Sequence, residues 1–452
     1  MSTILVKNAL IIATMNSAEE EIPKGAIFIR DNAIEQIGTT AELSHLADIA
    51  DRVIDLTGHV VLPGLINTHH HMYQTLTRAM VQDGTLFEWL VGLYPIWAGL
   101  TDEMIHTSTL TASAELLLSG CTTSSDHLYI FPNDCTLDSQ IRAAGEIGIR
   151  FHAARGSMSL GESDGGLPPD SCVEDEKSIM RDTVRLIESY HDAERHAMMR
   201  IVVAPCSPFS VTGNLMREAA EVARSYKHVH LHTHLAETID EEEFCIQTFG
   251  KRPVALMEQY GWLGSDVWHA HCVHMDEQEI AQFRKTGTGL AHCPSSNMRL
   301  GSGIAPICSC IDHNVRIGLG VDGSASNDGS HLLGEARQAM LLQRVKHGSG
   351  AFSARQALKL ATRGGAAVLG RDDIGHLAPG MSADLIAINL DHLAYAGATH
   401  DPIAAVMFCQ PQNVDWSIIN GKVIVEKRVL QTIDTAWLTQ KHVALSQDLL
   451  NK

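Results

Sequence analysis

Three consecutive histidines closely follow an apolar stretch early in the chain. Residues 60–66, which include a Pro-Gly pair, indicate a buried strand, and His69, His70 and His71 come shortly after it. Alternate residues of an extended chain face the same side, so we expect His69 and His71 to point into one space and His70 to point away. Two imidazoles on one side form a metal clamp. The alternative is a chance run of histidines, since the chain contains 25 of them.

Three later apolar stretches also end in residues that bind metals or move protons. One ends at His234, with Glu237 three residues farther on; the next ends at His271, and the last at Asp322. A single strand histidine is more often a core residue, and an aspartate before glycine more often forms a turn. In a parallel barrel, however, chemistry takes place where the strands end. Because four strands end in this way, we predict that these residues form one site.

The residue types in this predicted site suit hydrolysis on one divalent metal ion. Three neutral imidazoles and a carboxylate around an open position are ligands that zinc takes readily, and iron and manganese are the alternatives. Such an ion lowers the pKa of a bound water to about 7. Glu237 and Asp322 are available to move protons, and His271 to polarise the substrate or stabilise an oxyanion.

Composition limits the partners that the chain can have. The formal net charge of −19 over 452 residues argues against nucleic acid and against an anionic membrane surface, because both attract basic proteins. A small, uncharged substrate fits this charge better. The sequence shows no leader segment and no apolar run of the roughly 18 residues that a membrane span requires. We therefore expect a cytoplasmic protein without a membrane or nucleic-acid partner; a homo-oligomer is left open.

The order of apolar patterns predicts an α/β fold in two parts. Both ends of the chain contain short β-type runs, and about 300 residues between them alternate apolar strands with helical stretches. This alternation is typical of a (β/α)8 TIM-type barrel. We predict that residues 61–374 form the barrel, and that residues 1–60 and 375–452 together form a small β-sandwich domain.

The order of these motifs resembles the amidohydrolase superfamily, in particular its cytosine/guanine-deaminase-like branch. The match covers nearly the whole chain, and it includes residues 291–303 and the Leu-Ala-Pro-Gly-Met-Ser-Ala-Asp-Leu run at 377–385. The resemblance implies a proton-shuttling role for Glu237 and a sixth-strand role for His271. It also implies four metal ligands: His69, His71, His234 and Asp322.

The resemblance also indicates how many metal ions to expect. Binuclear members of the superfamily carry a carboxylated lysine on the fourth barrel strand. That strand is best assigned here to residues 201–205, which follow Arg200 and contain no lysine. We therefore expect one Zn²⁺ per chain.

Several residues bear on the choice of substrate. Gln74 lies three residues after His71, where guanine deaminases carry a glutamine that binds the purine edge, and an amide can donate and accept at once. The loop at 205–210 lacks the arginine with which guanine deaminases hold the base. Residues 87–90 and 155–169 instead resemble 8-oxoguanine deaminases and hydroxylated s-triazine aminohydrolases.

Two further residues of these segments have two interpretations each. Arg155 either reaches a ring oxygen of the substrate or forms a structural ion pair. Trp89 either offers an aromatic surface to the ring or belongs to a helical core.

The resemblance therefore implies hydrolytic deamination of 8-oxoguanine to urate and ammonia. The alternatives among enzymes are s-triazine, isocytosine and guanine aminohydrolases. A metal-dependent binding protein on the same scaffold is the alternative outside enzymes, but ligand binding alone does not need both Glu237 and Asp322. The unrelated zinc deaminases are excluded, because their Pro-Cys-x-x-Cys signature does not occur in this sequence.

Overall fold

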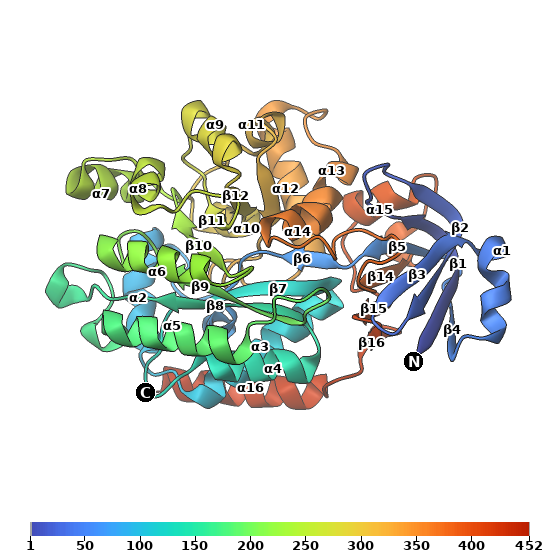
Figure 1. Ribbon diagram of the computed structural model, residues 1–452, viewed down its shortest axis with the longest axis horizontal. Helices are drawn as coiled ribbons and strands as arrows, with labels where there is room; N and C mark the ends of the chain where they lie inside the picture. The colour runs from blue at the N-terminus through green and yellow to red at the C-terminus, as the bar shows by residue number, and fades with distance from the viewer. Residues whose placement is uncertain (1, 452) are drawn as a thin grey trace.

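Eight parallel strands close into a barrel at the centre of the molecule (Figure 1). The structure is a computed structural model that describes residues 2–451. The barrel confirms the predicted (β/α)8 architecture. Its strands are β6 (Leu65–Asn67), β7 (Cys121–Leu128), β8 (Arg150–Ser157), β9 (Met199–Pro205), β10 (His230–Leu235), β11 (Val267–His271), β12 (Gly289–His292) and β13 (Arg316–Leu319).

Helices surround the barrel and connect its strands (Figure 1). Their ends carry ordinary capping signals: the Asp276 carboxylate accepts the first free N–H groups of α9, and Gly287 ends this helix with a φ of 76°. The helices after the first barrel strand are α2 (Leu86–Trp97), α3 (Asp102–Leu118), α4 (Leu137–Ile147), α5 (Glu176–Tyr190), α6 (Gly213–Ser225), α7 (Ile239–Phe249), α8 (Pro253–Tyr260), α9 (Glu277–Thr286), α10 (Pro294–Arg299), α11 (Ile307–Asp312), α12 (Leu332–His347), α13 (Ala354–Lys359), α14 (Gly365–Val368), α15 (Pro402–Phe408) and α16 (Thr435–Leu450).

The two ends of the chain form a second sheet beside the barrel (Figure 1). The predicted sandwich is, in the structure, one continuous sheet of nine strands, with α1 (Thr40–Leu43) after its third strand. The strands are β1 (Thr3–Ala13), β2 (Glu21–Arg30), β3 (Ala33–Thr39), β4 (Arg52–Asp55), β5 (His59–Pro63), β14 (Leu385–Asn389), β15 (Trp416–Ile419), β16 (Lys422–Glu426) and β17 (Val429–Leu430).

The apolar stretch before the histidines is two strands rather than the single strand that the sequence suggests. β5 pairs with β1 and β14 in the terminal sheet, whereas β6 pairs with β7 and β13 in the barrel. Gly64 lies between them, and a Cβ at this position would come within 2.0 Å of the Thr122 hydroxyl oxygen. The change from sheet to barrel therefore comes at Gly64, just after the predicted boundary at residue 60, because only glycine fits this close approach.

The last helix returns to the barrel next to the first barrel strand. α16 packs against α3 and against η2 (Met72–Thr77), the short helix after the histidine run. The His442 Nε2 lies 3.0 Å from the Thr75 carbonyl oxygen, and the Ser446 hydroxyl donates to the Leu76 carbonyl at 2.6 Å. The C-terminus thus holds the segment that contains Gln74.

A buried ion pair joins the barrel to the terminal sheet. Arg150, at the start of β8, donates from Nε and Nη2 to the two carboxylate oxygens of Asp384, both at 2.9 Å. Arg150 is 0% exposed and Asp384 4%. Arg150 Nη1 donates to the carbonyls of His196 and Ala197, so all three nitrogens of the guanidinium are satisfied.

No helix within residues 2–451 combines the length and the apolar character needed to cross a membrane.

Replacing Asp384 with alanine would leave the Arg150 guanidinium buried without its counter-charge. We expect the free energy of unfolding to fall by about 3 to 5 kcal/mol. Urea denaturation followed by circular dichroism measures the change. Glu35→Ala is the control, because its ion pair with Arg30 is exposed, and we expect a loss of less than about 1 kcal/mol. Equal losses in the two variants would contradict the role of the buried pair.

Candidate metal centre and active site

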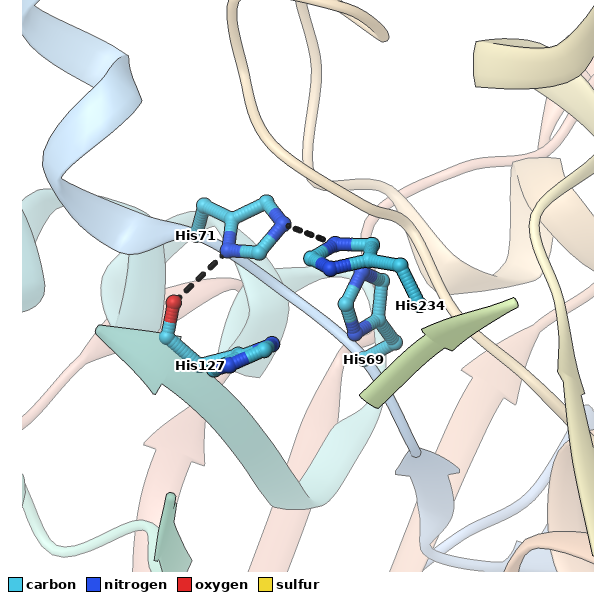
Figure 2. A group of neighbouring side chains, drawn as sticks. All are labelled: His69, His71, His127 and His234. Carbon is cyan, nitrogen blue, oxygen red and sulfur yellow. Dashed lines mark hydrogen bonds between the residues drawn. The ribbon is translucent and has the colours of Figure 1, made fainter. Parts of the chain in front are cut away.

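The carboxyl ends of the barrel strands bring the sequence-predicted residues together. His69 and His71 follow β6, His234 lies near the end of β10, His271 is the last residue of β11, and Asp322 follows β13. Figure 2 shows that His69, His71 and His234 point toward one another. All five side chains are buried except that of His234, which is partly exposed.

The hydrogen bonds of His71 and His234 fix which ring nitrogen carries the proton. His71 donates from Nδ1 to the His127 carbonyl at 2.7 Å, and His234 donates from Nδ1 to the Cys206 carbonyl at 2.5 Å. In neutral rings, both Nε2 atoms are then unprotonated acceptors. They nevertheless lie 3.0 Å apart (Figure 2). Two lone pairs at this distance repel each other unless a cation lies beside both.

His69 presents a third lone pair to the same place. Its Nδ1 lies 2.8 Å from the Nε2 of His232, whose own Nδ1 donates to the Trp268 carbonyl at 3.0 Å. This relay leaves the Nε2 of His69 unprotonated, and that atom is buried without a hydrogen-bond partner. The Asp322 Oδ1 lies 3.3 Å from it and 3.4 Å from the Nε2 of His71. The donor set of three imidazoles and one carboxylate therefore fits a divalent ion such as zinc.

Burial keeps these histidines neutral, as metal ligands must be. Desolvation lowers the pKa of His71 to about 4 and that of His271 to about 3, and it lowers the pKa of His69 well below its usual value. Burial alone would raise the pKa of Asp322, but the neighbouring imidazoles hold this pKa well below its usual range. Burial thus disfavours protonated rings, and positive charge on the rings favours the ionised form of Asp322.

His127 is a member of this cluster that the sequence analysis missed. One nitrogen of its ring lies within 4.8 Å of a ring nitrogen in each of His69, His71 and His234. Its Nε2 donates to the Ala204 carbonyl at 2.7 Å, and its ring stacks on that of His234 with centroids 5.0 Å apart (Figure 2). His127 also lies at a strand end, in β7, so the positional signal that found the others applies to it as well.

Glu237 lies beside the cluster, with its carboxyl group buried. Its carboxyl is 4% exposed, and its Oε2 lies 3.5 Å from the Nε2 of His271. The Ser302 hydroxyl donates to the other oxygen at 3.3 Å, and the Glu237 N–H donates to Glu241 at 2.8 Å. Burial, together with the charges of Asp322 and Glu241, raises the pKa of Glu237 well above its usual value. The pKa values of the two carboxyl groups of the site are thus shifted in opposite directions.

The His271 ring is oriented so that its Nε2–H faces Glu237 and the metal-ligand cluster. The Asn297 amide donates to its Nδ1 at 3.0 Å, so the proton of the neutral ring is on Nε2. Both His271 and Asp322 have left-handed backbone, with φ values of 70° and 61°. This conformation is uncommon outside glycine, and here it turns the chain sharply at two strand ends.

A cavity of about 670 Å³ opens over the cluster. Gln74 lies in its wall, 1% exposed, and neither polar atom of its amide has a hydrogen-bond partner. Gly323 packs directly against the Gln74 amide: a Cβ at this glycine would come within 1.8 Å of the amide oxygen. The wall also includes Trp89, Tyr94 and Phe209, and the Trp89 indole donates to the Ala325 carbonyl at 3.1 Å.

The structure does not bring Arg155 to this cavity. Its guanidinium donates to both carboxylate oxygens of Glu174, at 2.7 and 2.9 Å, and to Asp182 at 3.1 Å. It also lies over the ring of Phe131. Of the two roles considered from the sequence, the structural ion pair is the one observed, because these carboxylates occupy all three nitrogens.

Residues 60–424 match the Amidohydrolase family. The chain belongs to this family. The match includes every residue of the cluster, and it agrees with the resemblance noted from the sequence motifs.

Individual relatives match this amidohydrolase over most of its length. The 8-oxoguanine deaminase of Pseudomonas aeruginosa is 46% identical over 454 residues, with all of both chains covered. The hydroxydechloroatrazine ethylaminohydrolase of Pseudomonas sp. strain ADP is 38% identical, with 88% of this chain and 85% of that protein covered. The crystal structure of atrazine chlorohydrolase from Arthrobacter aurescens TC1 complexed with zinc is 34% identical, covers 98% of this chain and 100% of its own, and superposes with a TM-score of 0.93.

His69→Ala should remove bound metal, because it takes away one of three converging lone pairs and the partner of Asp322. We expect metal content after native purification, measured by mass spectrometry, to fall about 10-fold or more, a loss at the level seen when metal-site residues are removed. His400→Ala is the matched control, since His400 is exposed and far along the chain. Full metal content in His69→Ala would remove His69 from the ligand set.

Proposed function

We propose that this amidohydrolase deaminates 8-oxoguanine and releases urate and ammonia. The observation that carries the proposal is the Gln74 amide, which is buried in the wall of the cavity with neither its donor nor its acceptor satisfied. Unsatisfied buried polar groups are costly, so an amide without partners in a cavity wall is a natural contact for a bound molecule. The full-length match to the P. aeruginosa 8-oxoguanine deaminase supports the same substrate.

The cavity suits a flat, polar heterocycle. A lactam edge offers one N–H and one carbonyl, which pair with the acceptor and the donor of the Gln74 amide. Trp89, Tyr94 and Phe209 supply aromatic surface around the same space.

We further propose one zinc ion per chain, held by His69, His71, His234 and Asp322. When bound, zinc supplies a Lewis acid that makes water nucleophilic near neutral pH. The zinc-complexed relative supports the metal. A single ion is supported by β9, which contains no lysine that could bridge two ions. Two ions per chain on metal analysis would contradict this part of the proposal.

The two carboxyl groups divide the proton transfers between them. As water adds to C2 of the purine, Glu237 gives its proton to the adjacent ring nitrogen and the ionised Asp322 takes a proton from the water. Asp322 then passes this proton to the amino group, which leaves as ammonia. The hydroxyl proton left on C2 returns to Glu237, and the product carries a carbonyl at that carbon. The Nε2–H of His271, aimed at the same space, stabilises negative charge on the oxygen during addition.

Glu237→Gln should keep the metal and lose turnover, because the amide cannot give up a proton. We expect kcat for ammonia release to fall by about 100-fold or more, the usual contribution of a general acid or base. Metal content of the same preparation is the control that separates a catalytic role from a ligand role. Normal turnover would remove Glu237 from the mechanism, and the binding-protein alternative would then gain support.

Gln74→Ala should weaken the recognition of the lactam edge. Leaving polar groups of the bound base unpaired costs about 1 to 3 kcal/mol, so we expect kcat/KM for 8-oxoguanine to fall by about 5- to 150-fold with metal content intact. Gln82→Ala, an exposed glutamine outside the cavity wall, is the control. An unchanged constant in Gln74→Ala would place Gln74 outside substrate recognition.

Ammonia release from a panel of 8-oxoguanine, guanine, isocytosine and hydroxylated triazines tests the substrate itself. We expect the highest kcat/KM for 8-oxoguanine. The match to the hydroxydechloroatrazine ethylaminohydrolase makes the triazines the strongest competitors. A panel led by a triazine would overturn the proposed substrate and leave the proposed chemistry standing.

A further inference from the structure

Four arginines are buried in the part of the chain that the structure describes, and three of them have carboxylate partners. Arg150 and Arg371 each direct the Nε–Nη2 edge of the guanidinium at one carboxylate, that of Asp384 or of Asp373. Arg155 uses the same two nitrogens for Asp182 and Glu174. This edge presents two parallel N–H groups, and it is the side of arginine that best matches two oxygens of an anion.

Arg200 is the exception. It is 5% exposed, and its only hydrogen bond among the described residues runs from Nη1 to the Gly370 carbonyl at 3.3 Å. Its Nε is buried without a partner, and no carboxylate of residues 2–451 comes within ion-pair distance. Burial and the nearby Arg371 lower the pKa of Arg200 only to about 10. The guanidinium is therefore a buried cation at neutral pH that lacks a counter-ion, an arrangement that costs free energy unless an anion pairs with it.

Arg200 lines a cavity of about 880 Å³ with other cations. Lys227 lies in the same wall and forms no ion pair among the described residues. Arg195 also lines it but is paired with Asp372 at 3.3 Å. The wall contains two acidic side chains, those of Asp372 and Glu194. The charges left without a carboxylate partner are thus those of Arg200 and Lys227, two cations that face one space.

This cavity is separate from the candidate active site. Arg200 is the second residue of β9, whereas Cys206, which binds His234, comes directly after the other end of this strand. Lys227 lies before the start of the adjacent strand β10. Because an extended strand rises about 3.3 Å per residue, roughly 20 Å separate the two sites. The cavity opens at the amino ends of the barrel strands and the cluster lies at their carboxyl ends.

We propose that the Arg200 cavity is a binding site for a phosphate group. A phosphate can accept hydrogen bonds from the Arg200 guanidinium and from the Lys227 ammonium, the two cations of the wall that lack carboxylate partners. Free inorganic phosphate and a phosphomonoester share this chemistry, and the experiment distinguishes them.

Isothermal titration of the metal-loaded enzyme with inorganic phosphate, at constant ionic strength, tests the site. We expect one phosphate per chain in the wild type and about 10- to 100-fold weaker binding in Arg200→Met, since a hydrogen bond to a charged group contributes this much. Lys227→Met, an exposed substitution, should also weaken binding. Arg217→Met on α6 removes the same charge outside this cavity and should change nothing. Glycerol phosphate in place of phosphate then shows whether the site takes a phosphomonoester more tightly.

Thermal unfolding gives a second readout that does not depend on activity. Arg200→Met removes an unpaired buried charge, so its Tm in phosphate-free buffer should be no lower than that of the wild type. Added phosphate should raise the Tm of the wild type and leave that of Arg200→Met unchanged. Ammonia release should be unchanged in this variant. Equal phosphate binding in the wild type and in Arg200→Met, or no binding up to about 20 mM in the wild type, would overturn the proposal.

Discussion

The Nδ1–H groups of three histidines are held by acceptors that belong to the barrel wall. The carbonyls of His127 and Cys206 hold His71 and His234, and the ring of His232 holds His69. Each ring then has only its Nε2 lone pair to offer, and strand geometry brings these lone pairs together around Asp322. The protein alone cannot satisfy this convergence, because lone pairs do not pair with one another. The hydrogen bonds that the three rings make to their outer neighbours therefore create the need for a cation between the rings.

The pKa values of the two carboxyl groups of the site shift in opposite directions, although burial by itself would raise both. Asp322 lies among imidazoles that favour its charged form, and its pKa is held low. Burial, together with the charges of Asp322 and Glu241, raises the pKa of Glu237. A pair of acids whose environments push their pKa values apart can hold a proton on one member and accept a proton on the other. The chemistry proposed here depends on this difference more than on either group alone.

The sequence was sufficient for the barrel and for the residues that end its strands, since both follow from apolar periodicity and residue type. It was not sufficient where a role depends on contacts between distant segments. The carboxylates that hold Arg155 come from a loop and a helix that no local pattern ties to it. The division of residues 59–67 between two sheets likewise follows from the contact between Gly64 and Thr122.

The bonds from α16 to η2 set an order of events during synthesis of the protein. The segment with Gln74 leaves the ribosome early, but Ser446, which holds the end of that segment, is made 370 residues after Leu76. At about 5 to 20 residues per second, roughly 20 to 70 s separate the two. β5, which leads into the first barrel strand, likewise cannot pair with β14 until β14 has been made. The segment with Gln74 therefore gains its support from α16 only after the whole barrel has been made.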